Sequence, residues 1–216
     1  MLQGILHCFF PPISLRGERG EWITEEERRE LRQCAPLRLE GTFLRAVGFR
    51  NIDHLVAADT YESSPLLRVA LQRFKYKHVL ALTPVLGELL GAALALLLTD
   101  TSTVLCPVPL HWRRLFARGW NQVDELANAV MKHTGITAKP LLQRIRDTGQ
   151  QVGRERRERK REMQHAFALN PGHIPLPDHV VLIDDVATTG ATLSAAANIL
   201  RQAGVNRIDA AVVALA

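Results

Sequence analysis

The sequence predicts an α/β fold in which an open parallel sheet follows a small N-terminal module. From residue 63 onward, stretches with the helical period of apolar residues alternate with short apolar runs of strand length. Such alternation is typical of strands that pair in parallel through right-handed helical crossovers. Residues 1–60 lack it and combine a Pro-Pro turn with charged stretches. We therefore divide the chain into a module over residues 1–60 and an α/β domain over residues 61–216.

The composition is that of a globular protein without a disulfide framework. Of the 216 residues, 47% are hydrophobic and 23% are charged, which excludes a disordered chain. The cysteines are odd in number, far apart and without a C-x-x-C pair: Cys8, Cys34 and Cys106. This pattern indicates a reducing compartment, and the first ten residues do not read as a signal peptide. We expect a cytoplasmic protein.

One apolar run, over residues 79–98, has the length of a membrane-spanning helix. Glu88 lies in its middle, and Thr83-Pro84 has the residue types that begin a helix. The remaining stretch, residues 84–98, has the length of a buried helix. We therefore expect no membrane span.

Capping residues and glycines predict where the other helices begin and end. The spacing Thr24-x-x-Glu27 is a capping box, Ser64-Pro65 begins a second helix, and glycines end two more. The expected helices cover residues 24–34, 65–74, 84–98, 121–133 and 191–203. The expected strands cover residues 102–108, 136–142, 179–183 and 207–215.

The chemistry is concentrated after the strand expected at residues 179–183. The next residues read D-D-V-A-T-T-G-A-T and lead into an apolar helix. The end of this segment meets a helix N-terminus, where backbone N–H groups and the helix dipole bind phosphate. Gly190 allows a positive φ and a close approach of backbone to an anion. Asp184 and Asp185, expected to be exposed at the strand end, suit two ribose hydroxyls or hydrated Mg²⁺.

This segment resembles the phosphoribosyl-pyrophosphate motif of type I phosphoribosyltransferases: four apolar residues, two acids, two variable residues, then T-T-G-x-T. The resemblance implies an open parallel sheet of that type, with Asp184 and Asp185 fixing the ribose and holding Mg²⁺ indirectly. It assigns the 5-phosphate to Thr188, Thr189, Gly190, Ala191 and Thr192. An ordinary strand–loop–helix joint uses the same residue types, but the spacing favours the motif.

Further motifs narrow the resemblance. The chain reads C-P-V-P-L-H-W-R-R over residues 106–114, R-G-W-N-Q over 118–122, and R-I-R-D-T-G-Q-Q over 144–151. With F-K-Y-K at residues 74–77, the chain from about residue 63 resembles the competence protein ComF/GntX family of bacteria. The resemblance implies a catalytic hood that includes Arg144 and Arg146. It implies pyrophosphate contacts from the loop after the strand at residues 102–108, at Pro109, Leu110, His111, Arg113 and Arg118.

Zinc is not expected, although that family usually opens with a four-cysteine zinc ribbon after an F-P-P turn. Phe10-Pro11-Pro12 is present, but Cys8 and Cys34 form no C-x-x-C pair. His7 cannot supply the missing ligands of a tetrahedral site.

The basicity of the chain is local. The net charge is +5, and residues 143–165 hold eight Arg or Lys and four Asp or Glu. A closing hood, a solvated charged helix and a nucleic-acid patch all fit such a stretch. The family pattern favours the hood for residues 144–151 and leaves residues 154–161 open between the three.

Three functions follow from the resemblance: a phosphoribosyltransferase of unknown acceptor, a non-catalytic ligand sensor or single-stranded DNA-handling accessory, and a nucleobase salvage enzyme. The second rests on the association of the ComF family with DNA uptake and use of external DNA. The third is disfavoured for hypoxanthine and guanine, because Thr188 stands where the 6-oxopurine enzymes carry an aspartate. The sequence identifies neither the acceptor nor the oligomeric state.

Overall fold

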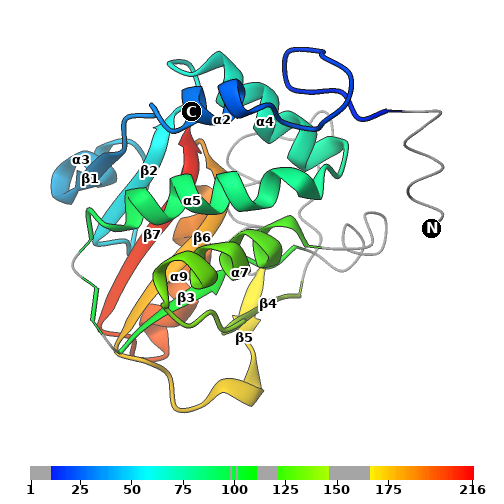
Figure 1. Cartoon of the computed structure of the whole chain (residues 1–216). Coiled ribbons are helices and arrows are strands. Elements are labelled where there is room, and N and C mark those ends of the chain that lie inside the picture. Colours follow the sequence, from blue (N-terminus) through cyan, green and yellow to red (C-terminus); the bar gives the residue numbers. More distant parts are fainter. Residues whose placement is uncertain (1–10, 98, 101, 111–120, 146–165) are drawn as a thin grey trace, which may run out of the picture.

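The computed structural model describes residues 11–97, 99–100, 102–110, 121–145 and 166–216. A five-stranded sheet forms its centre, with the strand order β1-β2-β7-β6-β3 (Figure 1). Four strands are mutually parallel, and β1 at the edge is antiparallel to β2. The strands are β1 (Leu37–Glu40), β2 (His54–Thr60), β3 (Thr103–Pro107), β6 (His179–Ala187) and β7 (Arg207–Leu215). The predicted α/β class with a largely parallel sheet is confirmed.

The expected helices are present and begin at or next to the residues that the sequence indicates. The helix expected over residues 24–34 ends at Leu31, however, and the one expected over residues 84–98 ends at Leu94. Thr24 forms the capping box, Ser64 and Asn121 cap their helices, and Gly135 ends one in the left-handed conformation with a φ of 76°. The α-helices are α2 (Glu25–Leu31), α3 (Gly41–Ala46), α4 (Pro65–Tyr76), α5 (Thr83–Leu94), α7 (Gln122–Thr134) and α9 (Ala191–Gln202). Short 3-10 helices cover η1 (Leu80–Leu82) and η2 (Pro171–His173).

Two apolar cores lie on opposite faces of the sheet. In Figure 1, α5 and α7 cover the front face, and α9 lies behind. Successive residues of β6 alternate between the cores: Val181 and Ile183 pack with α5 and α7, whereas Val180 and Leu182 pack with α9. This period of two is the pleat of a strand that is buried on both faces.

The strand predicted over residues 136–142 is wrong in its extent. A single parallel bridge, Leu105↔Ala138, extends the sheet beyond β3. Pro140 follows and has no N–H to donate to a ladder, so the pairing ends there. The chain then forms β4 (Leu142–Arg144), which pairs antiparallel with β5 (Phe167–Leu169) in a separate two-stranded sheet.

The predicted boundary at residue 60 falls at the end of β2, within the main sheet. Leu55 of β2 pairs with Ala210 of β7, so the strand belongs to the same sheet as the C-terminal segment. The elements β1, β2 and α3 were not among those expected from the sequence. Strand β1 and helix α3 are too short to display a period, and the centre of β2 is a short apolar run that is buried on both faces.

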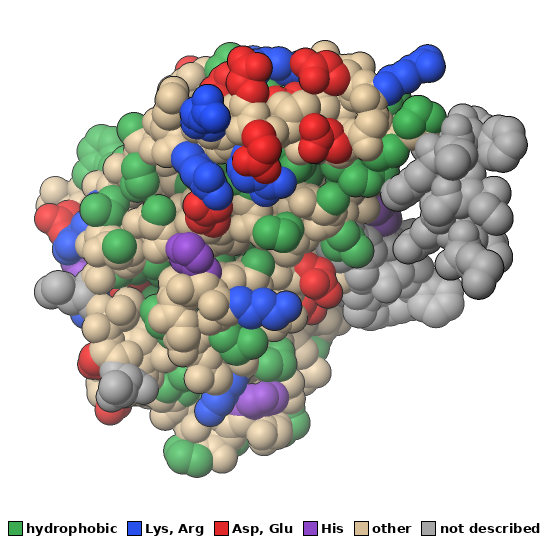
Figure 2. Space-filling model, viewed as in Figure 1, with side chains coloured by type: hydrophobic (Ala, Val, Ile, Leu, Met, Phe, Trp, Pro, Cys, Tyr) green, Lys and Arg blue, Asp and Glu red, His purple; other side chains and the backbone are tan. Residues whose placement is uncertain are grey.

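The first described residues are held on the front layer by charged side chains. Arg73 of α4 donates hydrogen bonds to the carbonyl oxygens of Ile13, Ser14 and Leu15. Arg32, after α2, contacts Glu88 of α5 in an ion pair of 2.8 Å. Figure 2 shows acidic and basic side chains interspersed over this part of the surface. Leu15, Ile23 and Leu31 are also buried in the front core, so apolar packing and polar contacts together join the N-terminal segments to the front layer.

The apolar run that resembles a membrane span forms α5, a helix of 12 residues. Among the described residues, no helix combines the length and the apolar character needed to cross a bilayer.

Candidate functional site

The candidate site lies at the carboxyl ends of β3 and β6. The chain leaves β3 through α7 on the front face and leaves β6 through α9 on the rear face (Figure 1). Adjacent parallel strands whose connections run to opposite faces define the switch point of an open α/β sheet, where ligands bind. Most of the residues that the sequence analysis selected follow these two strands.

Asp184 and Asp185 lie inside β6, not in a loop after it. The strand continues to Ala187, because Asp184 pairs with Val212 and Val186 pairs with Ala214 of β7. The expectation of an exposed acid is wrong for Asp185, which is only 6% exposed. Continued pairing with the long strand β7 keeps this end of β6 inside the protein.

Lys75 is the partner of Asp185. Its Nζ atom lies 3.0 Å from Oδ1 of Asp185, and both side chains are largely buried. Burial alone would lower the pKa of Lys75, but the charges of Asp185 and Asp184 raise it above its ordinary value. The ammonium group therefore stays charged and balances one of the two carboxylates.

The second carboxylate is held in a less favourable environment. Burial and the neighbouring charge of Asp185 raise the pKa of Asp184 to about 7, against the opposing effect of Lys75 and Arg144. Arg144 of β4 also lies over the ring of Phe167, 5.4 Å from its centre. The structure thus brings the predicted residue Arg144 toward the acid pair. An acid with a pKa near 7 in the free protein is ready to accept a cation or a hydrogen-bond donor.

The loop from Thr188 to the start of α9 presents an uncapped helix N-terminus. Three other helices have a side chain that accepts from their first turn, at Thr24, Ser64 and Asn121. Gly190 is the N-cap of α9 and provides no such acceptor. Helices α3 and α5 also begin without one, but α9 is the helix that follows the acid pair at the switch point. The first N–H groups of a helix lack partners within it, so those of α9 are suited to an anion.

The side chains of this loop divide between solvent and core. Thr188 and Thr189 are exposed, Ala191 and Thr192 are partly exposed, and Gly190 is buried. Gly190 has a φ of 68°, which confirms the positive φ expected of it. A Cβ at this position would also lie 2.7 Å from the ring of Phe49. Glycine is required for its conformation and also for this close packing.

Gln122 is a member of the site region for which the sequence analysis assigned no role. Its Nε2 atom donates to the carbonyl oxygen of Lys75 at 2.6 Å and to that of Phe74 at 3.4 Å. These carbonyls belong to the last turn of α4, so Gln122 fixes the turn that carries Lys75. Gln122 and Lys75 belong to the N-Q and F-K-Y-K motifs of the sequence, but only the tertiary structure shows that the two motifs are in contact.

The loop after β3 begins at the same edge of the sheet. Pro107 pairs with Ile183, and the N–H of Val108 donates to the carbonyl oxygen of Ile183 at 2.9 Å. Pro109 and Leu110 follow, partly exposed and adjacent to the end of β6. The other predicted anion-binding residues lie outside the described residues: His111, Arg113, Arg118 and Arg146.

The acid pair fits Mg²⁺ that arrives with a phosphorylated ligand. In the described part of the chain, no group of three or more His, Cys, Asp or Glu side chains gathers as a metal cage. Mg²⁺ commonly uses one or two carboxylates together with phosphate oxygens and water. For zinc, Cys34 is partly buried, while His7 and Cys8 lie outside the described residues.

Comparison with known proteins places residues 129–216 in a family described as the phosphoribosyl transferase domain. Competence protein F of Haemophilus influenzae is 31% identical over 152 residues, 66% of this chain and 65% of that protein. The DNA utilization protein YhgH of Salmonella typhi is 30% identical over 156 residues, 69% of this chain and 66% of that protein. The namesake from Escherichia coli K12 is 36% identical over 100 residues, 45% of this chain and 42% of that protein. The chain therefore matches slightly less than two thirds of the length of the first two relatives and about two fifths of the third.

Proposed function

Because the chain belongs to the family of competence protein F and DNA utilization protein YhgH and contains a phosphoribosyl transferase domain, we propose that it binds phosphoribosyl pyrophosphate with Mg²⁺. The observation that carries this proposal is the uncapped N-terminus of α9, placed directly after a buried acid pair at the switch point of the sheet. The carboxylate pair lies near the carboxyl end of β6, and the anion-binding segment from Thr188 to Thr192 follows it three to eight residues later. A sugar phosphate presents the matching groups, a phosphate and vicinal hydroxyls.

The 5-phosphate lies on the loop from Thr188 to Thr192 in this proposal. The first N–H groups of α9 and the exposed hydroxyls of Thr188 and Thr189 donate to its oxygens. Asp184 and Asp185 accept hydrogen bonds from the ribose hydroxyls. The hydrogen-bond donors of the loop then face the phosphate of ribose 5-phosphate, and the carboxylate acceptors face its ribose hydroxyls.

Mg²⁺, when bound with the ligand, neutralises the pyrophosphate and supports its departure. Lys75 holds Asp185 in place through their 3.0 Å contact, and Gln122 holds the turn that carries Lys75. Arg144 adds a positive charge on the side of β4. Departure of pyrophosphate needs positioning and charge stabilisation, and these residues supply both without a covalent nucleophile.

The acceptor of the ribosyl group is left open, as is turnover itself. Thr188 cannot act as the base that 6-oxopurine enzymes place there, so we propose an acceptor other than hypoxanthine or guanine. A role in competence or DNA utilization is proposed from the names of the relatives. Release of pyrophosphate separates an enzyme from a protein that only binds the ligand.

Calorimetry with phosphoribosyl pyrophosphate, with and without Mg²⁺, tests the proposal. Thr188→Ala/Thr189→Ala removes two exposed hydroxyls and leaves the core unchanged. Each lost bond to a charged phosphate is worth about 1.5–3 kcal/mol, so affinity falls at least about tenfold. Thr137→Ala is the matched control, because this exposed threonine lies beside β3 and away from the loop. Absence of binding by the unmodified chain, or equal binding by both variants, contradicts the proposal.

A further inference from the structure

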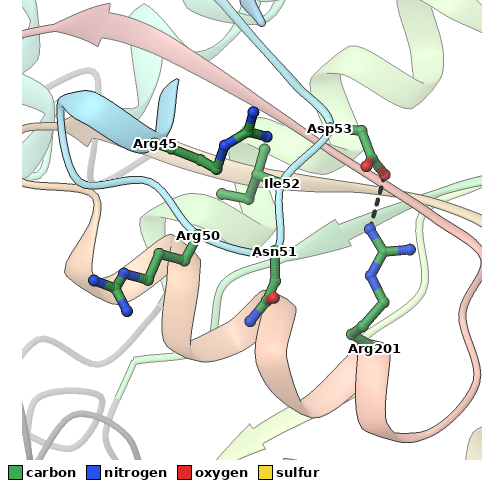
Figure 3. A pocket seen from close by; sticks show the side chains of 6 residues that line it. All are labelled: Arg45, Arg50, Asn51, Ile52, Asp53 and Arg201. Carbon is green, nitrogen blue, oxygen red and sulfur yellow. Dashed lines mark hydrogen bonds and ion pairs between the residues drawn. The ribbon is translucent and has the colours of Figure 1, made fainter. Parts of the chain in front are cut away.

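A polar pocket of about 530 Å³ lies between the segment that follows α3 and the outer side of α9. Figure 3 shows its lining, which consists of Arg45, Arg50, Asn51, Ile52, Asp53 and Arg201. Its volume is in the range of small-molecule sites. Ile52 is the one apolar residue of the lining, so a polar ligand suits the pocket better than an apolar one.

The charges of the lining are unbalanced. Asp53 is its one carboxylate, and its Oδ2 atom already accepts from Arg201 at 2.9 Å and from the N–H of Ile208 at 2.9 Å. Within the described residues, neither Arg45 nor Arg50 has a hydrogen bond or ion pair from its guanidinium group. Two uncompensated guanidinium groups therefore line the pocket. The planar donor fork of arginine matches the oxygens of phosphate.

One wall of the pocket, formed by residues 48–53 and carrying Arg50, is held in place by hydrogen bonds to α9. The N–H of Arg50 donates to Oγ of Ser194 at 2.8 Å, and Nδ2 of Asn51 donates to Oδ1 of Asn198 at 3.2 Å. Asn51 has a φ of 60°, a left-handed conformation that few residues other than glycine adopt. Asparagine is one of the residues that tolerate this conformation, and contacts with the surrounding structure hold it in place. The two bonds to α9 are such contacts.

The same wall touches the loop that carries the candidate phosphate site. A Cβ on Gly48 would lie 2.9 Å from the carbonyl oxygen of Thr189, and one on Gly190 would lie 2.7 Å from the ring of Phe49. The N–H of Ser194 donates to the carbonyl oxygen of Gly190 at 2.8 Å. Residues 48–49 are therefore packed directly against residues 189–190.

We propose that this pocket is a second anion site, which takes a small phosphate-bearing molecule and is separate from the acid pair and loop of β6 and α9. Figure 3 shows Arg45 and Arg50 on different sides of the lining, so each guanidinium group meets a different part of the ligand, and Asn51 adds an amide donor or acceptor. The site does not depend on the function proposed above.

Calorimetry of the full chain with inorganic phosphate, without Mg²⁺, tests the site. The variant Arg45→Gln/Arg50→Gln removes both free charges, and because both side chains are exposed, folding is retained. Arg19→Gln/Arg29→Gln is the matched control, since it removes the same charge from exposed positions elsewhere. We expect the pocket variant to lose one class of phosphate sites, with an affinity at least about tenfold lower, and the control to keep it.

The outcomes separate this inference from the proposed function. If the pocket variant binds phosphate as the control does, the second site does not exist. If the unmodified chain has only one class of phosphate-binding site and the pocket variant loses it, phosphate binds in the pocket. The loop before α9 is then not an anion site. The same variants are also tested for binding of a single-stranded oligonucleotide. If the unmodified chain binds the oligonucleotide through Arg45 and Arg50 but does not bind phosphate, the surface binds nucleic acid and the proposal of a small-molecule site is wrong.

Discussion

The ammonium group of Lys75 lies 3.0 Å from Oδ1 of Asp185, although the two residues are 110 positions apart in the chain. Lys75 comes from the last turn of α4 and Asp185 from β6, so the contact joins the front layer to the sheet. It places a resident positive charge beside an acid pair that is expected to meet Mg²⁺. Any cation that binds there competes with Lys75 or is positioned by it.

Lys75→Gln should destabilise the free protein by about 2 kcal/mol, because Asp185 is left as an unpaired buried charge and Lys75 is only partly exposed. Millimolar Mg²⁺ should recover part of this loss, since the ion replaces the missing charge. Urea unfolding at pH 8, with and without Mg²⁺, measures both effects. Lys77→Gln, at an exposed neighbouring position, should change neither value. Equal Mg²⁺ responses in the two variants would contradict a cation site at Asp185.

Asp184→Asn should stabilise the free protein and weaken its ligand binding. The pKa of Asp184 is raised to about 7 in the folded chain, against about 3.9 when unfolded. Ionisation therefore opposes folding, with no effect below about pH 4 and the full effect above about pH 7. We expect the variant to be about 2 kcal/mol more stable at pH 8, after allowance for partial exposure, and unchanged near pH 4.

Urea unfolding across this pH range measures the change, with Glu21→Gln as an exposed control. A variant that is less stable than the unmodified chain at pH 8 would show that the carboxylate is favourably paired. The raised pKa of Asp184 also predicts that Mg²⁺-dependent binding of phosphoribosyl pyrophosphate weakens as the pH falls below 7, because protonation removes the negative charge of this carboxylate.

Gly190→Ala should cost more stability than Gly135→Ala, although both glycines have a positive φ. Gly135 has open space where a Cβ would stand, so alanine there meets only the left-handed strain of roughly 1–2 kcal/mol. At Gly190 the Cβ also meets the ring of Phe49, which adds about 1–3 kcal/mol. Denaturant unfolding of the two variants provides the comparison. Equal losses would mean that the 48–49 segment does not pack against the loop.

Asp209→Asn should remove a stabilising contribution that depends on pH. Burial alone would raise the pKa of Asp209, but hydrogen bonds from His179 and His54 and the charge of Arg207 lower it below its ordinary value. The stabilisation is therefore present above about pH 4, the unfolded pKa, and is lost as the pH falls through the lower folded pKa. We expect a loss of about 3 kcal/mol at pH 7, because Asp209 is fully buried and its carboxylate pairs with the guanidinium group of Arg207 at 2.8 Å.

Acid unfolding followed by circular dichroism tests this role. The unmodified chain should lose stability steeply below pH 4, and the variant should show a smaller pH dependence. Glu62→Gln, at an exposed position, serves as the control. If both variants follow the same acid profile, Asp209 does not carry the acid sensitivity of the fold.

Local signals in the sequence determined the fold class and the loop of the candidate site. The caps at Thr24 and Ser64 and the glycine at 135 act through contacts within a few residues, so they are legible without a structure. The same holds for Gly190, whose positive φ begins α9. The motif after β6 likewise orders acids, glycine and hydroxyls along one short segment.

Only the tertiary structure decided which distant residues share a site and how deeply they are buried. The extension of β6 through Asp185 depends on pairing with β7, and the charge balance there depends on Lys75 from α4. Likewise, Gln122 reaches Lys75, and Phe49 packs on Gly190, across wide gaps in the sequence. Sequence periodicity reports which face of an element is apolar, but the partner that covers it, and hence the environment of each charge, is set by the packing of remote elements.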